Sequence, residues 1–198
     1  MPHLFPMFVK LSGRECLVVG GGRVAEPKIE SLLACGAVVR VVAPSVTPAI
    51  AGWWREDRLA WRPHGFHPSD LDGKFLVVAA TSCAEVNEAV FRHAQAGGVL
   101  CNAVDEPERC DFYYPAIVRR GDLQIAISTA GASPALASRL REELETLIGP
   151  EYARVVERLG SARKRLFARP MDPARRRRIL HRLARFAVPT ARRAEGRT

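Results

Sequence analysis

The stretch CLVVGGGRVA, Cys16–Ala25, decides how this sequence folds. Its four apolar residues lead directly into three glycines, a pattern that predicts a buried strand followed by a tight turn. Apolar residues then recur at helical spacing, and Gly36 is a natural helix stop. Val38–Ala43 has the composition of a second buried strand. A strand, a crossover helix and a second strand within about 30 residues indicate a parallel βαβ unit.

The same alternation continues along the chain. Phe75–Ala80 is an apolar strand, Ala84–Ala96 has a helical pattern, and Val99–Val104 is a further strand. Near-continuous apolar strands are typical of a parallel sheet covered on both faces, so we predict an α/β fold with a Rossmann-type sheet. Pro44–Pro48 and Pro63–Asp72 are predicted loops, and the three tryptophans between them are expected to cover the sheet edge.

The pattern changes after residue 111. Residues 116–118 and 123–127 predict an antiparallel hairpin. Ser133 followed by Pro134 fits the N-cap and first position of an amphipathic helix, which we expect to end at residues 149–150. The remainder is predicted to be helical and basic, with breaks at prolines 170 and 173.

The net charge of +9 is unevenly distributed, because residues 1–150 sum to −2 and residues 151–198 to +11. Such a basic segment favours a polyanionic partner, which could be nucleic acid, a membrane surface or a small molecule with many carboxylates; the alternative is a solvated helical face. The chain has no long apolar run, no signal-like N-terminus and five cysteines without a C-x-x-C pair. These features predict a cytoplasmic protein with reduced thiols.

Gly20, Gly22 and Ala25 match the pattern G-x-G-x-x-A between a predicted strand and a helix, which is the context of a dinucleotide-binding loop. The first glycine permits the turn, the second lets the backbone approach a pyrophosphate, and the alanine allows close packing of helix and strand. The acid that usually grips the ribose is missing after the second strand, where Pro44 and Ser45 stand instead. We favour NAD over NADP as the cofactor.

Asp105 is the candidate catalytic carboxylate. It follows a buried strand, and ligands of open α/β sheets bind beyond the carboxyl ends of the strands. A carboxylate there could accept a proton while a hydride leaves for nicotinamide, or it could simply cap a turn. Thr81 lies at a similar edge and could instead cap the following helix. The five histidines have no metal-ligand spacing, and no serine lies in a G-x-S-x-G elbow, so we expect neither a metal site nor a hydrolase triad.

Five separated motifs together resemble the precorrin-2 dehydrogenase family, which includes the N-terminal half of sirohaem synthase. They are Leu4–Phe8, Leu17–Lys28, Ala79–Thr81, Cys101–Asp105 and Ser128–Ala137. The resemblance covers about residues 1–150. It departs from the family at Pro27 and Thr129, where other residues are usual.

The resemblance implies NAD-dependent oxidation of precorrin-2 to sirohydrochlorin and, in some members, insertion of ferrous iron to give sirohaem. It also implies a homodimer and three domains: an NAD-binding Rossmann domain at 1–112, a dimerisation region at 113–149 and a basic helical domain at 150–198. Since no methyltransferase half follows, we expect another protein to methylate uroporphyrinogen. Iron insertion is left open by the residues, which show no dedicated metal cage.

These considerations assign three groups of site residues. Asp105 is the predicted catalytic residue. The predicted cofactor-binding residues are Gly20, Gly21, Gly22, Arg23, Val24, Ala25, Pro44, Ser45, Thr81, Asn102 and Val104. The predicted substrate-binding residues, which the resemblance places near the tetrapyrrole, are Ser128, Thr129, Gly131 and Ser133.

A competing hypothesis is an NAD(H)-sensing nucleic-acid-binding protein whose arginine-rich tail grips phosphates. Against it, the tail lacks interleaved aromatic residues and shows no helix-turn-helix pattern. A tetrapyrrole carrier that kept the fold without the oxidation is a third possibility.

Overall fold

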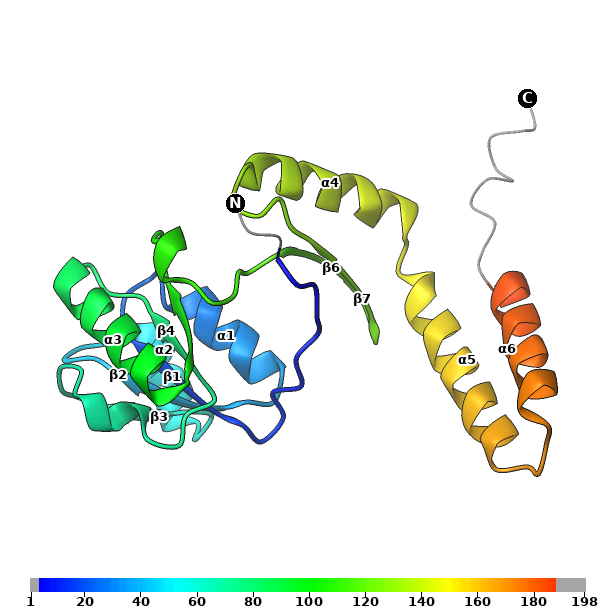
Figure 1. The fold of residues 1–198 in the computed structure, drawn as a ribbon, viewed down its shortest axis with the longest axis horizontal. Coiled ribbons are helices and arrows are strands. Elements are labelled where there is room, and N and C mark those ends of the chain that lie inside the picture. The colour runs from blue at the N-terminus through cyan, green and yellow to red at the C-terminus, as the bar shows by residue number, and fades with distance from the viewer. Residues whose placement is uncertain (1–3, 188–198) are drawn as a thin grey trace. The chain divides into compact units, whose positions relative to one another are not determined.

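A computed structural model describes residues 4–187 and divides the chain into two compact units, residues 1–113 and 114–198 (Figure 1). The last eleven residues of the predicted basic helical domain, 188–198, lie outside the described residues. Within the described residues, no helix is long and apolar enough to cross a bilayer.

The first unit is built on a five-stranded parallel sheet in the order β3-β2-β1-β4-β5. The strands are β1 (Glu15–Val19), β2 (Val38–Val42), β3 (Ala60–Arg62), β4 (Leu76–Ala79) and β5 (Leu100–Ala103). The order runs outward from β1 in both directions, which makes the space beside β1 and β4 a topological switch point. This confirms the predicted Rossmann-type sheet.

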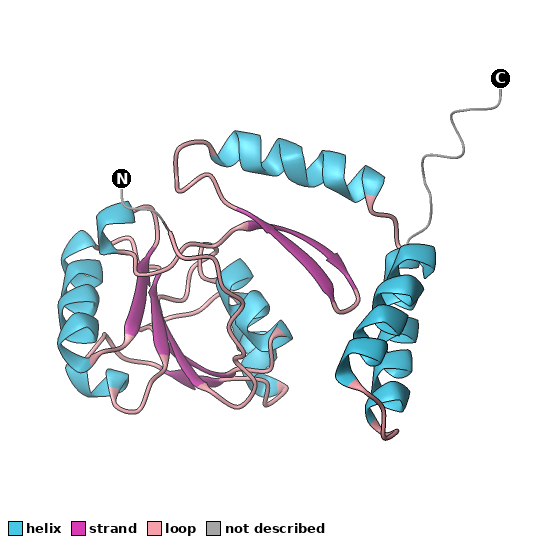
Figure 2. Cartoon of the chain, turned by 45° about the vertical axis from the view of Figure 1, so that its right-hand side comes forward, coloured by secondary structure: helices cyan, strands magenta, loops and turns pink. Residues whose placement is uncertain are grey.

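Helices lie on both sides of the sheet (Figure 2). The α-helices of the unit are α1 (Glu26–Ala34), α2 (Pro48–Arg55) and α3 (Ala84–Gly97), and the 3₁₀ turns are η1 (Pro68–Leu71) and η2 (Pro107–Arg109). Because both faces are covered, strand β4 is buried at all four positions, as its unbroken apolar run predicts. Val90 and Ala94 of α3 join the core cluster with Leu17, Val77 and Cys101.

The structure adds two elements between the predicted loops at 44–48 and 63–72, and the short turn η1 lies within the second loop. Helix α2 begins at Pro48, where Thr47 accepts the N–H of Ile50 at 3.4 Å, and it includes Trp53 and Trp54. Strand β3 then forms the sheet edge, and Trp61 donates its indole N–H to the carbonyl of Ala43 at 3.0 Å. The prediction missed these elements because both are short and prolines bound the region.

The second unit pairs β6 (Ala116–Arg120) with β7 (Leu123–Ile127) in an antiparallel hairpin, as predicted. Three helices follow: α4 (Pro134–Leu147), α5 (Glu151–Phe167) and α6 (Pro173–Ala187). Ser133 caps α4 through its hydroxyl oxygen, and Pro134 is the first helical residue, both as expected.

The second unit buries little. Among its described residues, 114–187, only Val118 and Ala137 have apolar side chains in the buried class. Leu136 and Leu147 of α4 are 50% and 62% exposed. The hairpin packs against α4 and α5, but this packing completely buries few apolar side chains.

Candidate active site

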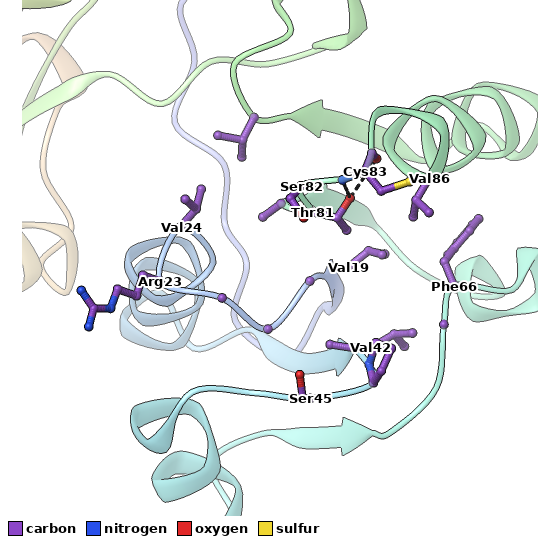
Figure 3. Close-up of a pocket in the computed structure, with 18 of the residues that line it drawn as sticks. Val19, Arg23, Val24, Val42, Ser45, Phe66, Thr81, Ser82, Cys83 and Val86 are labelled. Carbon is purple, nitrogen blue, oxygen red and sulfur yellow. Dashed lines mark hydrogen bonds between the residues drawn. The ribbon is translucent and has the colours of Figure 1, made fainter.

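A cleft of about 670 Å³ opens at the carboxyl ends of the parallel strands, within the first unit (Figure 3). Four segments line it: residues 19–24 after β1, 42–45 after β2, 80–83 after β4, and 104–105 after β5. Gly65, Phe66 and Val86 complete the wall. The cleft therefore lies at the switch point, where this fold binds its ligands.

The glycine loop crosses the cleft floor under steric constraint. Gly20 has φ +116°, and a Cβ there would overlap the backbone carbonyl of Ala80. A Cβ at Gly21 would overlap the carbonyl oxygen of Ser45 and approach Val46 Cγ1 to 2.8 Å. Both positions therefore require glycine, the first also because positive φ disfavours side chains.

Gly22 and Ala25 have different surroundings. A Cβ at Gly22 would meet nothing within 4 Å, so this glycine leaves its backbone accessible from the cleft. Ala25 is fully buried and does not line the cleft. A cradle of open backbone with helix α1 just beyond it fits the pyrophosphate of a dinucleotide, since N–H groups and the positive end of the helix dipole favour an anion there.

The remaining residues of the loop and of the end of β2 also line the cleft. Val24 is half exposed, and Pro44 and Ser45 follow β2. Figure 3 shows the Ser45 hydroxyl directed toward the glycine loop, whereas the Arg23 side chain points away from the rest of the cleft. At the end of β2 the cleft lining thus contains a serine rather than an acid.

Thr81 both lines the cleft and shapes the loop before α3. Its Oγ1 accepts the N–H of Cys83 at 3.2 Å and lies 2.7 Å from Oδ1 of Asn87, to which it donates. Asn87 belongs to α3 and is buried. The hydroxyl therefore lies at the cleft edge and orders the turn before α3, but it does not cap the helix, whose N-cap residue Cys83 has no side-chain cap hydrogen bond.

Asp105 lies at the cleft edge in a strained turn. Its φ is +64°, and the turn closes with the N–H of Glu106 donating to the carbonyl of Ala103 at 3.2 Å. A left-handed backbone at a non-glycine residue costs on the order of 1 kcal/mol and is concentrated at functional sites. Asp105 thus both forms a turn and lines the cleft.

Lys28 of α1 lies in the electrostatic neighbourhood of Asp105. Burial lowers the pKa of Lys28 most strongly, while the charge of Asp105 and the thiol of Cys110 raise it. Burial likewise raises the pKa of the Cys110 thiol, which donates to the carbonyl of Ala103 at 3.1 Å. The base of the Asp105 turn is therefore a partly buried region with a cation near the carboxylate.

Two other predicted residues of β5 and its end differ in position. Val104 lines the cleft, whereas Asn102 is buried outside the lining. Asn102 Nδ2 donates to the carbonyl of Phe112 at 2.8 Å and contacts Cys110 Sγ at 3.3 Å. Its side chain holds the segment that leaves β5.

The four predicted substrate-binding residues belong to the loop between β7 and α4 of the second unit. The hydroxyl oxygens of Ser128 and Thr129 accept the N–H groups of Ala130 and Ser133, and the Ser133 hydroxyl caps α4. Gly131 has φ +84°. These side chains give the loop a defined conformation.

Several residues of this region were not predicted from the sequence. Phe66, Ser82 and Cys83 line the cleft, and Asn87 and Glu106 lie behind it. Ser82 and Cys83 could have been found, since they follow a strand as Thr81 does. Phe66 could not have been found, because it belongs to a loop that is distant in sequence from the glycine loop. Within residues 4–187, no group of three His, Cys, Asp or Glu residues could hold a metal ion.

Two family models match the chain. Residues 7–116 match the family described as "Putative NAD(P)-binding", and residues 120–147 match "Sirohaem biosynthesis protein central". The first match covers more than half of the chain.

Among curated proteins, the chain is 47% identical over 150 residues to "Siroheme synthase" of Methylobacillus flagellatus, covering 76% of this chain and 32% of that protein. It is 42% identical over 178 residues to "Siroheme synthase 3" of Aeromonas hydrophila, covering 90% and 38%. The chain thus spans about a third of the length of these relatives. Among solved structures, "SirC, precorrin-2 dehydrogenase" matches with a TM-score of 0.78 and 30% identity, over 91% of this chain and 89% of that one.

Proposed function

Because the chain belongs to the precorrin-2 dehydrogenase family, we propose that it oxidises precorrin-2 to sirohydrochlorin with NAD, as a step of sirohaem biosynthesis. The observation that carries the proposal is the meeting of the glycine loop and the Asp105 carboxylate in one cleft at the switch point. The matched families give no support to the nucleic-acid-binding alternative.

The residues around the cleft fit NAD. The lack of side chains at Gly20 and Gly21 leaves room for the dinucleotide. The open backbone at Gly22 binds the pyrophosphate, and Ser45 binds the ribose. Thr81 and Val104 form the wall on the side of Asp105. When bound, NAD supplies the acceptor for a hydride.

Asp105 is the proposed base. Oxidation of the macrocycle removes two hydrogens, one as a hydride to NAD and one as a proton to the Asp105 carboxylate, and the electron pair left behind forms the new double bond. The products are sirohydrochlorin, NADH and the protonated carboxyl, which returns its proton to water. Lys28 lies near enough to this carboxylate for the two groups to interact electrostatically.

The oligomeric state is part of the same proposal. We assign the second unit to a homodimer interface, because its described residues bury only Val118 and Ala137 while α4 leaves Leu136 exposed. Replacing Leu136 with glutamate is expected to shift the mass in sedimentation from dimer to monomer. A wild-type chain that sediments as a monomer at every concentration would contradict the assignment. The five free cysteines suit a reducing compartment such as the cytoplasm.

Ferrous iron insertion is a second candidate activity. The curated relatives carry the name of sirohaem, the iron-bearing product, so iron would be a substrate of this chain rather than a resident cofactor. The anionic Asp105 could accept pyrrole protons as the metal enters.

One anaerobic experiment tests both activities. The chain is incubated with enzymatically prepared precorrin-2 and NAD, and the absorbance of NADH and of the tetrapyrrole is followed with and without ferrous ion. We expect NADH to appear with the wild type and to be nearly abolished by Asp105→Asn, which tolerates the same backbone conformation. Turnover by Asp105→Asn near the wild-type rate would remove this carboxylate from catalysis, and absence of turnover by the wild type would overturn the function.

A further inference from the structure

A buried amide lies behind the cleft, at the side chain of Asn87 in α3. The residue is only 4% exposed, yet its side chain makes four hydrogen bonds. Oδ1 accepts from the Thr81 hydroxyl at 2.7 Å and from the Thr81 N–H at 3.4 Å. Nδ2 donates to the Thr81 carbonyl at 3.2 Å and to Oε1 of Glu106 at 3.1 Å. Both acceptor sites and both donors of the amide are therefore used.

This arrangement fixes the orientation of the amide. If the side chain of Asn87 were turned over, its oxygen would face the Thr81 carbonyl and the Glu106 carboxylate, and its N–H groups would face the backbone N–H of Thr81. Both arrangements would repel. Only a side chain with a donor pair and an acceptor at this spacing satisfies all four contacts, which singles out asparagine.

The two partners of Asn87 belong to different walls of the cleft. Thr81 follows β4 and lines the cleft, while Glu106 directly follows Asp105 at the end of β5. Glu106 is held from its other side by an ion pair with Arg109, whose second Nη lies 3.4 Å from Glu88 of α3. The Glu106 side chain is therefore anchored to α3 by two routes.

We propose that Asn87 is a positioning residue that ties the cofactor-side loop at Thr81 to the turn that carries Asp105. Such a tether would help to hold the turn, because Asp105 has a left-handed backbone that costs energy even at an aspartate, and a single backbone hydrogen bond closes it. Fixing both walls to one amide fixes the distance between the carboxylate and the bound dinucleotide. The kinetic consequence rests on the proposed function, since it requires Asp105 to act on a substrate beside NAD.

The test replaces the hydrogen-bond donor of the Asn87 side chain with an acceptor. Asn87→Asp keeps an acceptor for the Thr81 hydroxyl but sets a carboxylate against Glu106. We expect kcat for NADH formation to fall by about 10- to 100-fold, while the Kd for NAD, measured by calorimetry, changes by about threefold or less. Adding Glu106→Gln supplies an amide donor to the new carboxylate and leaves an oxygen for Arg109, so the double variant should recover part of the lost kcat; the contact with the Thr81 carbonyl stays unfavourable.

Gln95→Ala is the matched control. Gln95 lies on the same helix, and its Nε2 donates to both oxygens of Asp111 at 2.9 and 2.8 Å, away from the cleft lining. Its loss should lower the melting temperature without changing kcat. If Asn87→Asp fails to fold, Glu106→Ala cuts the same tether from the other end and should give the same loss of kcat at unchanged NAD affinity.

Amide hydrogen exchange of the NAD-free protein separates this inference from the proposed function. Cutting the tether should speed exchange at residues 81–83 and 104–106 relative to Gln95→Ala, whether or not the wild type oxidises precorrin-2. Unchanged exchange at both loops in Asn87→Asp, or a loss of kcat that Glu106→Gln fails to restore, would overturn the positioning role. A wild type that exchanges as expected but forms no NADH would overturn the function alone.

Discussion

Replacing Gly22 with aspartate isolates the electrostatic part of cofactor binding. Because a Cβ at Gly22 meets nothing within 4 Å, the new side chain fits without moving its neighbours. The change therefore adds one negative charge to a loop where the cofactor brings two. At separations of roughly 5 to 7 Å and an effective dielectric constant of about 40 in this open cleft, the repulsion sums to about 2–3 kcal/mol. That corresponds to a loss of NAD affinity of about 30- to 150-fold.

Calorimetry with NAD measures this loss directly, and thermal unfolding without NAD should show a melting temperature within a few degrees of wild type. Raising the salt concentration should recover part of the affinity, because the interacting charges are accessible to solvent. Gly22→Ala supplies the steric control and should bind NAD almost normally. An aspartate variant that binds NAD as tightly as wild type at low salt would refute the assignment of the loop.

Three further changes test other parts of the structure. Gly21→Ala forces a methyl group against the carbonyl of Ser45, so chemical denaturation should show a loss of about 2 kcal/mol or more, and a wild-type unfolding midpoint would contradict the steric argument. Ser133→Ala removes the N-cap of α4 and should cost about 1 kcal/mol by the same measurement, with no change if the cap is dispensable. Burial raises the pKa of Cys16 from 9.0 to about 11, so unfolded chains ionise this thiol first and stability should fall as pH rises from about 9 to 11. Cys16→Ala should reduce the loss of stability with rising pH, whereas Cys35→Ala, at an exposed position, should not. The same dependence of stability on pH in both variants would contradict the role of Cys16.

The parts that the sequence predicts well are those set by local pattern. An apolar strand, a run of glycines and a helical pattern together predict a tight turn. Gly20 adopts the positive φ that glycine tolerates easily. The cap at Ser133 depends on its own residue type and the proline after it, so it too is legible in the sequence. The apolar runs of the strands predict the sheet for the same reason, because each run is a local pattern.

The parts that the sequence could not give depend on chain segments that meet only after folding. In the sequence, nothing distinguishes Gly21 from the glycines beside it. Only the folded structure places the carbonyl of Ser45 next to it. Asn87 is one polar residue in a helical pattern, and its importance emerges only when Thr81 and Glu106 converge on it. Aspartate tolerates a left-handed backbone better than most residues do, but that Asp105 adopts it becomes visible only in the turn after β5.

The scarcity of buried side chains in the second unit has a thermodynamic consequence. In the proposed homodimer, a unit whose described residues bury only Val118 and Ala137 would gain folding free energy from the partner's surface, so its melting temperature should depend on protein concentration. Diluting the protein should loosen residues 114–187 before the sheet of the first unit responds. Substitutions on the exposed face of α4 would then change protein abundance in the cell without touching the nucleotide cleft.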